Sequence, residues 1–161
     1  MKRRLALSLL TAATLALALA AGPARAGSDT NTLTVQANVL GTCTIDPATL
    51  DFGDYDPAAV KDVSANITVN CTYGTSHWIG LDLGTNGDRT MAGGTSEFLT
   101  YELYRDALRT ETWDDADPGV TSPAGTPGLA AYTATVYGRI PANQLVSTGA
   151  YADSVTMTVN F

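Results

Sequence analysis

Apolar and polar residues alternate strictly in two segments of the chain. Thr32–Val39 reads T-L-T-V-Q-A-N-V, and Ser154–Phe161 reads S-V-T-M-T-V-N-F. Strict alternation over this length is typical of a β-strand with one buried face. The two segments therefore predict two half-buried strands. We call their apolar faces the N-terminal row (Leu33, Val35, Ala37 and Val39) and the C-terminal row (Val155, Met157, Val159 and Phe161).

Shorter strands are predicted between these two segments. Almost nothing after residue 27 has the period of a helix. Turn signals separate the apolar runs, and a polar connection rich in proline and glycine spans Arg105–Gly128. Several short strands with turns between them are typical of a β-sandwich. The expected strands are Cys43–Ile45, Val63–Cys71, His77–Leu83, Phe98–Tyr104, Ala131–Tyr137 and Tyr151–Phe161.

The number of strands suggests an incomplete sandwich. From Cys43 onward the pattern gives six or seven strands, whereas an immunoglobulin-like sandwich has about seven with both edges covered. The last run, Tyr151–Phe161, has no strand after it, and Thr32–Val39 precedes the rest of the domain. We therefore expect an all-β, immunoglobulin-like β-sandwich that lacks its last strand and is completed by donor-strand exchange. The N-terminal row would be the donor strand, and the C-terminal row would line the acceptor groove of the next molecule.

The first 26 residues have the features of a cleavable export signal. Lys2–Arg4 is basic, Leu5–Ala21 is apolar, and Ala24–Ala26 has the small-x-small pattern of a cleavage site. An apolar stretch of 17 residues is shorter than the roughly 20 that a membrane span needs. The expected organisation is a signal peptide at 1–26, a donor-strand extension at 27–41 and one domain at 42–161.

Cleavage of this signal would leave a strongly acidic protein. It would remove four of the nine basic residues and none of the sixteen acidic ones, so the formal charge would be −11. An acidic surface repels nucleic acid phosphates and anionic lipids, so we expect no nucleic acid partner.

The chain has two cysteines, Cys43 and Cys71, which are 28 residues apart. In an exported protein an isolated pair indicates a disulfide bond. A structural zinc site needs about four ligands, and only His77 would add a second type of soft ligand. We therefore expect a disulfide and no metal.

Nothing in the sequence indicates an enzyme or a cofactor. His77 is the only histidine, and its neighbour Ser76 cannot form a catalytic pair with it along a strand. The motifs G-x-S-x-G, H-E-x-x-H and the P-loop do not occur. Glu111, Asp114, Asp115 and Asp117 form an acidic cluster without the spacing of a calcium loop.

Three aromatic residues leave a second function class open. Trp78, Trp113 and Tyr104 could stack on sugar rings, as in a carbohydrate-binding surface module. The alternative is that these aromatic side chains fill the sandwich.

One short segment is expected to be structural. In Tyr137–Pro141, Gly138 and Pro141 are expected to end a strand. Arg139 is one of five cations left after signal cleavage, and we expect it to pair with a carboxylate or with backbone carbonyls.

Over nearly its whole exported length the chain resembles the spore coat protein U domain family, which includes subunits of archaic chaperone–usher pili. The combination of Y-G-R-I-P and G-x-Y-x-D-x-V is the most specific part of the match. The matching segments are Thr32–Val39, Cys43–Ile45, Leu50–Pro57, Ile67–Cys71, Tyr101–Asp106, Arg109 with Trp113, Val136–Pro141 and Gly149–Val155.

The resemblance implies a structural subunit of a surface fibre with a role in adhesion or biofilm formation. Its partners would be neighbouring copies or related subunits, a periplasmic chaperone that first fills the groove, and an outer-membrane usher. The protein would pass through the periplasm to the cell surface. A tip adhesin carries an extra N-terminal domain, so a shaft subunit is expected. The alternative is a secreted spore-coat or surface-layer protein that uses the same domain.

Overall fold

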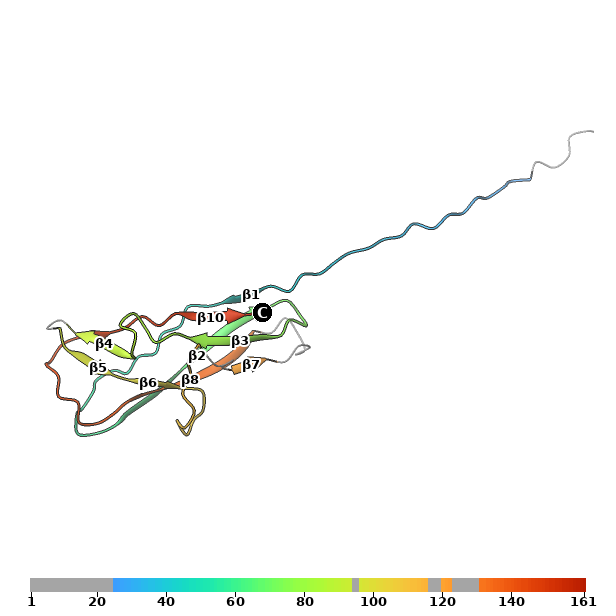
Figure 1. Ribbon diagram of the computed structural model, residues 1–161. Coiled ribbons are helices and arrows are strands. Elements are labelled where there is room, and N and C mark those ends of the chain that lie inside the picture. The colour runs from blue at the N-terminus through green and yellow to red at the C-terminus, as the bar shows by residue number, and fades with distance from the viewer. Residues whose placement is uncertain (1–24, 94–95, 116–119, 123–130) are drawn as a thin grey trace, which may run out of the picture. The chain divides into compact units, whose positions relative to one another are not determined.

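A computed structural model describes residues 25–161 apart from 94–95, 116–119 and 123–130 (Figure 1). Most of the predicted signal peptide therefore lies outside the described residues. Within them, no helix is long and apolar enough to cross a membrane. The chain divides into two units, one ending at Ala37 and the other comprising Asn38–Phe161.

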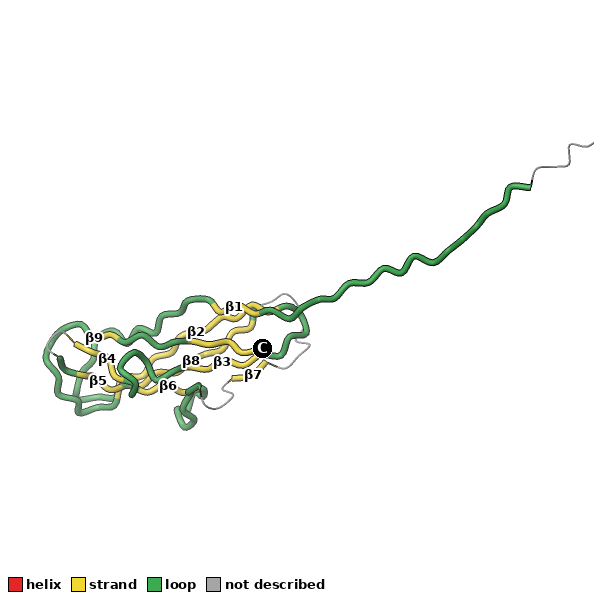
Figure 2. Tube along the Cα trace, turned by 45° about the horizontal axis from the view of Figure 1, so that its top comes forward, coloured by secondary structure: helices red, strands yellow, loops and turns green. Residues whose placement is uncertain are grey.

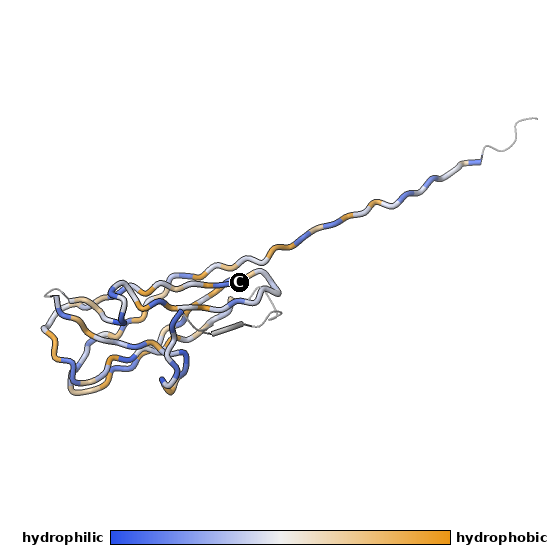
Figure 3. The backbone as a smooth tube through the Cα atoms, in the orientation of Figure 1, coloured by the Kyte–Doolittle hydropathy of each residue, from blue (hydrophilic) through white to orange (hydrophobic). Residues whose placement is uncertain are grey.

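The described part of the first unit, residues 25–37, contains no strand or helix. Its side chains are exposed to solvent, and apolar and polar residues alternate along it (Figure 3). Leu33 and Val35 are 85% and 83% exposed. The predicted strand Thr32–Val39 is thus not part of a sheet in a single copy, because a strand gains its hydrogen-bonded ladder only beside a partner.

The second unit is a sandwich of antiparallel strands (Figures 1 and 2). One sheet has the order β1-β2-β8-β6, and two smaller sheets have the orders β10-β3-β7 and β5-β4-β9. The strands of the described residues are β1 (Cys43–Ile45), β2 (Lys61–Cys71), β3 (His77–Leu81), β4 (Thr90–Gly93), β5 (Phe98–Thr100), β6 (Glu102–Tyr104), β7 (Val120–Ser122), β8 (Tyr132–Ile140), β9 (Tyr151–Ala152) and β10 (Met157–Asn160).

The two smaller sheets share two stretches of chain: one runs from β3 to β4, and the other runs from β9 to β10. β3 pairs with β10, and further along β4 pairs with β9. The ladder is interrupted between these pairs, so the predicted strand Tyr151–Phe161 is in fact two short strands. At this interruption two carboxylates connect the two stretches by hydrogen bonds to the backbone. Asp82 accepts the N–H of Thr156 at 2.8 Å, and Asp153 accepts the N–H of Thr85 at 3.0 Å.

The core lies between the sheets and follows from alternation along β2 and β8. Ile67 pairs with Ala134 and Ala65 with Val136, so their side chains lie on the same face. The buried apolar residues are Phe52, Ile67, Val69, Ile79, Leu81, Leu99, Tyr101, Leu103, Trp113, Ala134, Val136 and Ile140.

The predicted strand Phe98–Tyr104 divides at Tyr101, because the chain passes from one sheet to another. β5 pairs with β4, whereas β6 pairs with β8. The buried Tyr101 lies between the two strands, and its N–H donates to the carbonyl of Arg89 at 2.9 Å, next to the Thr90–Thr100 pair that ends the β4–β5 ladder. The sequence pattern also does not predict β4, or β7, which lies in the expected loop Arg105–Gly128.

Gly138 does not end a strand, contrary to expectation, because β8 continues through it to Ile140. Gly138 is buried and faces the core. The space that a side chain at this position would need is already occupied by the side chains of Leu50 and Phe52. A Cβ atom at Gly138 would lie 2.6 Å from Cδ2 of Leu50 and 2.8 Å from Cζ of Phe52. Only glycine therefore fits this position of the strand without a shift of its neighbours.

The expected disulfide bond joins β1 to the end of β2. Cys43 and Cys71 are direct partners in the antiparallel register, with an S–S distance of 2.00 Å. The bond anchors a strand of only three residues.

Candidate functional site

An open groove of about 960 Å³ lies in the second unit. One wall is the segment 48–57, which follows β1, and the other is the segment 146–157, which includes β9. Its floor consists of side chains from the sandwich interior, most of them apolar: Ala65, Ile67, Leu81, Met91, Leu99, Tyr101, Leu103, Val136 and Ile140.

The sandwich is open along the edge between β1 and β10. The two strands lie beside each other. β1 pairs with β2 and β10 pairs with β3, and across the described ranges neither has a second partner strand. An edge of this kind offers backbone N–H and C=O groups to an incoming strand.

The C-terminal row is only partly in this groove. Val155 and Met157 line it. Val159 packs against the core without lining the groove, and Phe161 is 64% exposed. Only the first half of the C-terminal row therefore lines the groove.

The sequence pattern did not identify two further residues on the same face. Tyr151 and Asp153 line the groove and are half-buried, whereas Ala152 and Ser154 contribute to its wall but are exposed. Asp153 interrupts the apolar pattern, so alternation of hydrophobic residues could not reveal it. Counting back from Val155 in steps of two residues would have placed Asp153 and Tyr151 on the same face as the C-terminal row.

Asp153 is held by hydrogen bonds at the groove. Its carboxylate accepts the hydroxyl of Tyr101 at 2.6 Å and the N–H groups of Ser154 and Thr85 at 2.8 and 3.0 Å. Burial and the neighbouring carboxylate raise the pKa of Tyr101 well above its usual value. The tyrosine therefore remains a hydrogen-bond donor to the carboxylate of Asp153.

Hydrogen bonds also fix the ends of both walls. The hydroxyl of Tyr55 donates to the carbonyl of Pro141 at 2.7 Å and accepts the N–H of Gln144 at 3.2 Å. The carboxylate of Glu97 accepts the hydroxyls of Ser147 and Tyr151. Neither wall depends on a bound strand for these contacts, so the groove is preformed.

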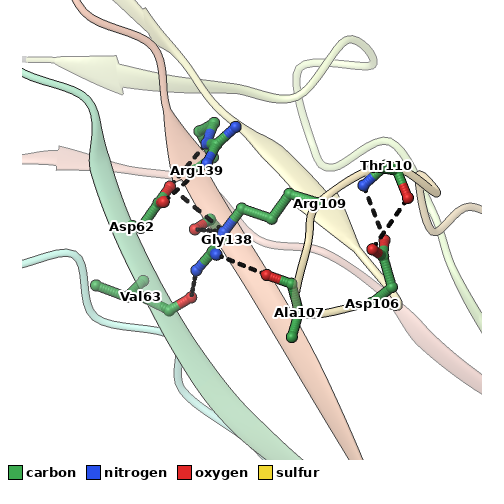
Figure 4. Close-up of polar contacts among 8 residues, drawn as sticks. All are labelled: Asp62, Val63, Asp106, Ala107, Arg109, Thr110, Gly138 and Arg139. Carbon is green, nitrogen blue, oxygen red and sulfur yellow. Dashed lines mark hydrogen bonds and ion pairs between the residues drawn. The ribbon is translucent and has the colours of Figure 1, made fainter.

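A second polar cluster lies outside the groove and spans β2 and β8 (Figure 4). Arg139 binds Asp62 with two hydrogen bonds of 2.8 Å, which confirms the expected pairing with a carboxylate. Arg109 lies in the loop after β6, and its guanidinium group donates to the carbonyls of Gly138 and Val63 at 3.3 and 3.2 Å. These contacts tie a loop to the sheet, so the cluster is structural.

Among the described residues, the cluster of potential metal ligands offers no free thiolate. Ligand atoms of Cys43, Cys71 and His77 lie within 4.8 Å of one another. The two sulfur atoms are bonded to each other, so they offer no thiolates. In the acidic cluster, Glu111 forms an ion pair with Arg105 at 2.7 Å, and Asp117 lies outside the described residues.

The aromatic residues do not form a common sugar-binding platform. Trp113 is 1% exposed, and its indole N–H donates to the carbonyl of Ile79 at 2.9 Å. Trp78 and Tyr104 are half-buried. Trp113 is therefore part of the core and cannot stack on a ligand.

The fold is similar to that of a chain solved in a chaperone–usher pilus complex. A solved chain in the "chaperone-tip adhesion subunit pre-assembly complex from archaic chaperone-usher Csu pili of Acinetobacter baumannii" superposes with a TM-score of 0.60 at 23% identity. The match covers 76% of this chain and 40% of that one, so this chain spans less than half of the solved chain.

Sequence comparison identifies the family. The Spore Coat Protein U domain model matches residues 29–158. Protein U of Myxococcus xanthus is 32% identical over 167 residues, covering 89% of this chain and 90% of that protein. The protein belongs to the Spore Coat Protein U domain family.

Proposed function

We propose that this protein is a structural subunit of a surface fibre that polymerises by donor-strand exchange, in which residues 27–41 of one copy occupy the groove of the next. One observation carries the proposal: the domain has a preformed groove beside an unpaired edge of β10, within the described residues. The same chain carries an exposed segment with strand alternation. The groove and the N-terminal row thus supply both halves of one interaction.

The expected interaction is β-augmentation. Backbone groups of the incoming strand extend the ladder at the edge of β10, and every second side chain enters the groove. Burial of each larger side chain of the N-terminal row contributes roughly 1.5–3 kcal/mol. Each added ladder bond contributes about 0.5–1.5 kcal/mol. Several such terms together are large enough to hold a fibre.

The partners and the location follow from the same groove. An open apolar groove at a strand edge is an aggregation hazard, so it needs a cover during export. A periplasmic chaperone and an outer-membrane usher are the proposed partners before assembly, and the fibre then lies at the cell surface. The solved relative belongs to a chaperone–tip adhesion subunit complex, which supports this part of the proposal. We assign the fibre a non-enzymatic role in adhesion or biofilm formation.

A secreted spore-coat or surface-layer protein is the second candidate. The similarity to Protein U along nearly its whole length favours it. A carbohydrate-binding module is less favoured, because Trp113 lies in the core.

Electrophoresis of cell-surface material with and without boiling tests the proposal. Strand-exchanged polymers resist detergent until they are heated, so a ladder at multiples of the subunit mass should collapse to one band on boiling. A single band in the unboiled sample would contradict the proposal and favour a monomeric coat protein or binding module.

A matched pair of substitutions locates the donor strand. Val35→Asp places a carboxylate in the groove, where burial without a partner is costly, so it should abolish the ladder when expressed alone. Its domain should still accept a strand from wild-type subunits. Thr34→Asp adds the same charge on the opposite face and should leave the ladder intact. Abundant heat-labile ladders from Val35→Asp alone would disprove the donor assignment.

A further inference from the structure

The groove contains both methionines of the exported chain. The sequence has three methionines, of which Met1 begins the predicted signal peptide. Met91 and Met157 both line the groove, and both are half-buried. We propose that they are oxidation sites, and that their oxidation by a peroxide prevents an apolar strand from binding in the groove. This inference rests on the proposed function of the groove.

The two residues come from strands that meet in the same cavity. Met91 lies on β4 opposite Leu99, and Met157 begins β10 opposite Leu81. Their partners are buried, with exposed fractions of 4% for Leu99 and 1% for Leu81. The methionines are thus packed on the core on one side, and the groove leaves them accessible from the other.

The reaction needs only a hydroperoxide. A lone pair of the thioether sulfur attacks the terminal peroxide oxygen, the O–O bond breaks, and an S–O bond forms. The sulfur loses two electrons to the peroxide, and the proton of the terminal oxygen moves to the other peroxide oxygen. That oxygen leaves as an alcohol, or as water when the oxidant is hydrogen peroxide. The flexible apolar side chain becomes a polar sulfoxide.

The consequence for strand binding follows from desolvation. In an open groove a sulfoxide oxygen is hydrated, but an apolar side chain placed over it removes that water without supplying a donor. The side chains of the N-terminal row carry no polar group that could bind the oxygen, and the backbone N–H groups of the strand are directed to the ladder. Oxidation should therefore weaken strand binding, and a bound strand should shield both sulfurs from peroxide.

The test uses the Val35→Asp chain after export, whose groove is open, and a synthetic peptide with the sequence of residues 27–41. Peptide affinity is measured before and after treatment with hydrogen peroxide, and mass spectrometry counts the oxygen atoms added at each methionine. We expect one oxygen on each residue and a loss of affinity of roughly tenfold or more per sulfoxide. Peptide bound beforehand should slow both oxidations, and methionine sulfoxide reductases should restore binding.

The double variant Met91→Leu/Met157→Leu is the control, because this exchange conserves volume. It should bind the peptide and lose its sensitivity to peroxide. If it does not fold, the single variants each retain one oxidation site and should show a smaller loss. Unchanged affinity of the doubly oxidised protein would overturn this inference alone. Failure of the untreated protein to bind the peptide would instead overturn the proposed function, and this inference with it.

Discussion

At the residue scale, Asp62 shows how a surface position stabilises the sandwich. It lies on β2 and receives two hydrogen bonds from Arg139 on β8. Arg109 approaches the same carboxylate at 3.3 Å. The hydrogen bond from Arg139, with the charges of both guanidinium groups, holds the pKa of Asp62 below its usual value despite partial burial.

This shift predicts a pH dependence of stability. Because the pKa of Asp62 is lower in the folded state, the unfolded chain binds the proton more tightly. The stabilisation is complete above the unfolded value of about 3.9 and is lost as the pH falls through the lower folded value. Asp62→Asn should cost about 0.5–1 kcal/mol at neutral pH, and its melting temperature should vary less below pH ~4.

Thermal unfolding across this pH range checks the prediction, with Asp54→Asn as the control because Asp54 is exposed. Equal acid sensitivity in wild type and Asp62→Asn would show that the ion pair does not contribute.

Gly138 carries the second residue-scale prediction. Gly138→Ala places a methyl group against Leu50 and Phe52 and should destabilise the domain by about 1–3 kcal/mol through overpacking. The double variant Gly138→Ala/Leu50→Ala should lose less than the sum of the two single changes, because removing Leu50 makes room. Strictly additive losses in denaturant unfolding would contradict this account of the glycine.

At the scale of elements, alternation predicted the two long neighbouring strands of the largest sheet, as Val63–Cys71 and Ala131–Tyr137. It missed the ends of those strands and the short strands β4 and β7, because a few residues carry too little period to stand out. Tyr151–Phe161 shows the same limit. Its period is intact, but its interruption depends on Asp82, which is distant in the sequence.

The candidate site could be predicted only in part, because alternation is present in just one of its two walls. The C-terminal row indicated Val155 and Met157, whereas the opposite wall, 48–57, has no strand and no apolar period. Two side chains of that wall, Leu50 and Phe52, pack against Gly138 of β8. Such tertiary contacts cannot be inferred from local pattern.

The disulfide supplies the prediction at this scale. It connects residues 28 apart, and loop closure of this size contributes on the order of 3–4 kcal/mol in the chain-entropy model. The double variant Cys43→Ser/Cys71→Ser should therefore melt at a clearly lower temperature. Reducing agent should lower the melting temperature of wild type and leave the variant unchanged. Equal melting temperatures of wild type and the double variant without reducing agent would show that the bond does not stabilise the domain.

At the scale of the whole molecule, the chain has two units, and the proposed function assigns each of them one part of the same interaction. The domain folds around its own core and leaves a groove, and the extension carries apolar residues that find no cover in a single copy. Leu33 and Val35 remain exposed although both are large and apolar. The proposed exchange would cover both surfaces at once.

Hydrogen exchange tests this claim most directly, because strand pairing protects backbone amides. Assembled wild-type protein and monomeric Val35→Asp are compared by mass spectrometry. We predict that amides of Thr32–Val39 exchange slowly in the assembled protein and rapidly in the monomer, with Met157–Asn160 also more protected on assembly. Rapid exchange throughout Thr32–Val39 in the assembled protein would contradict donor-strand exchange.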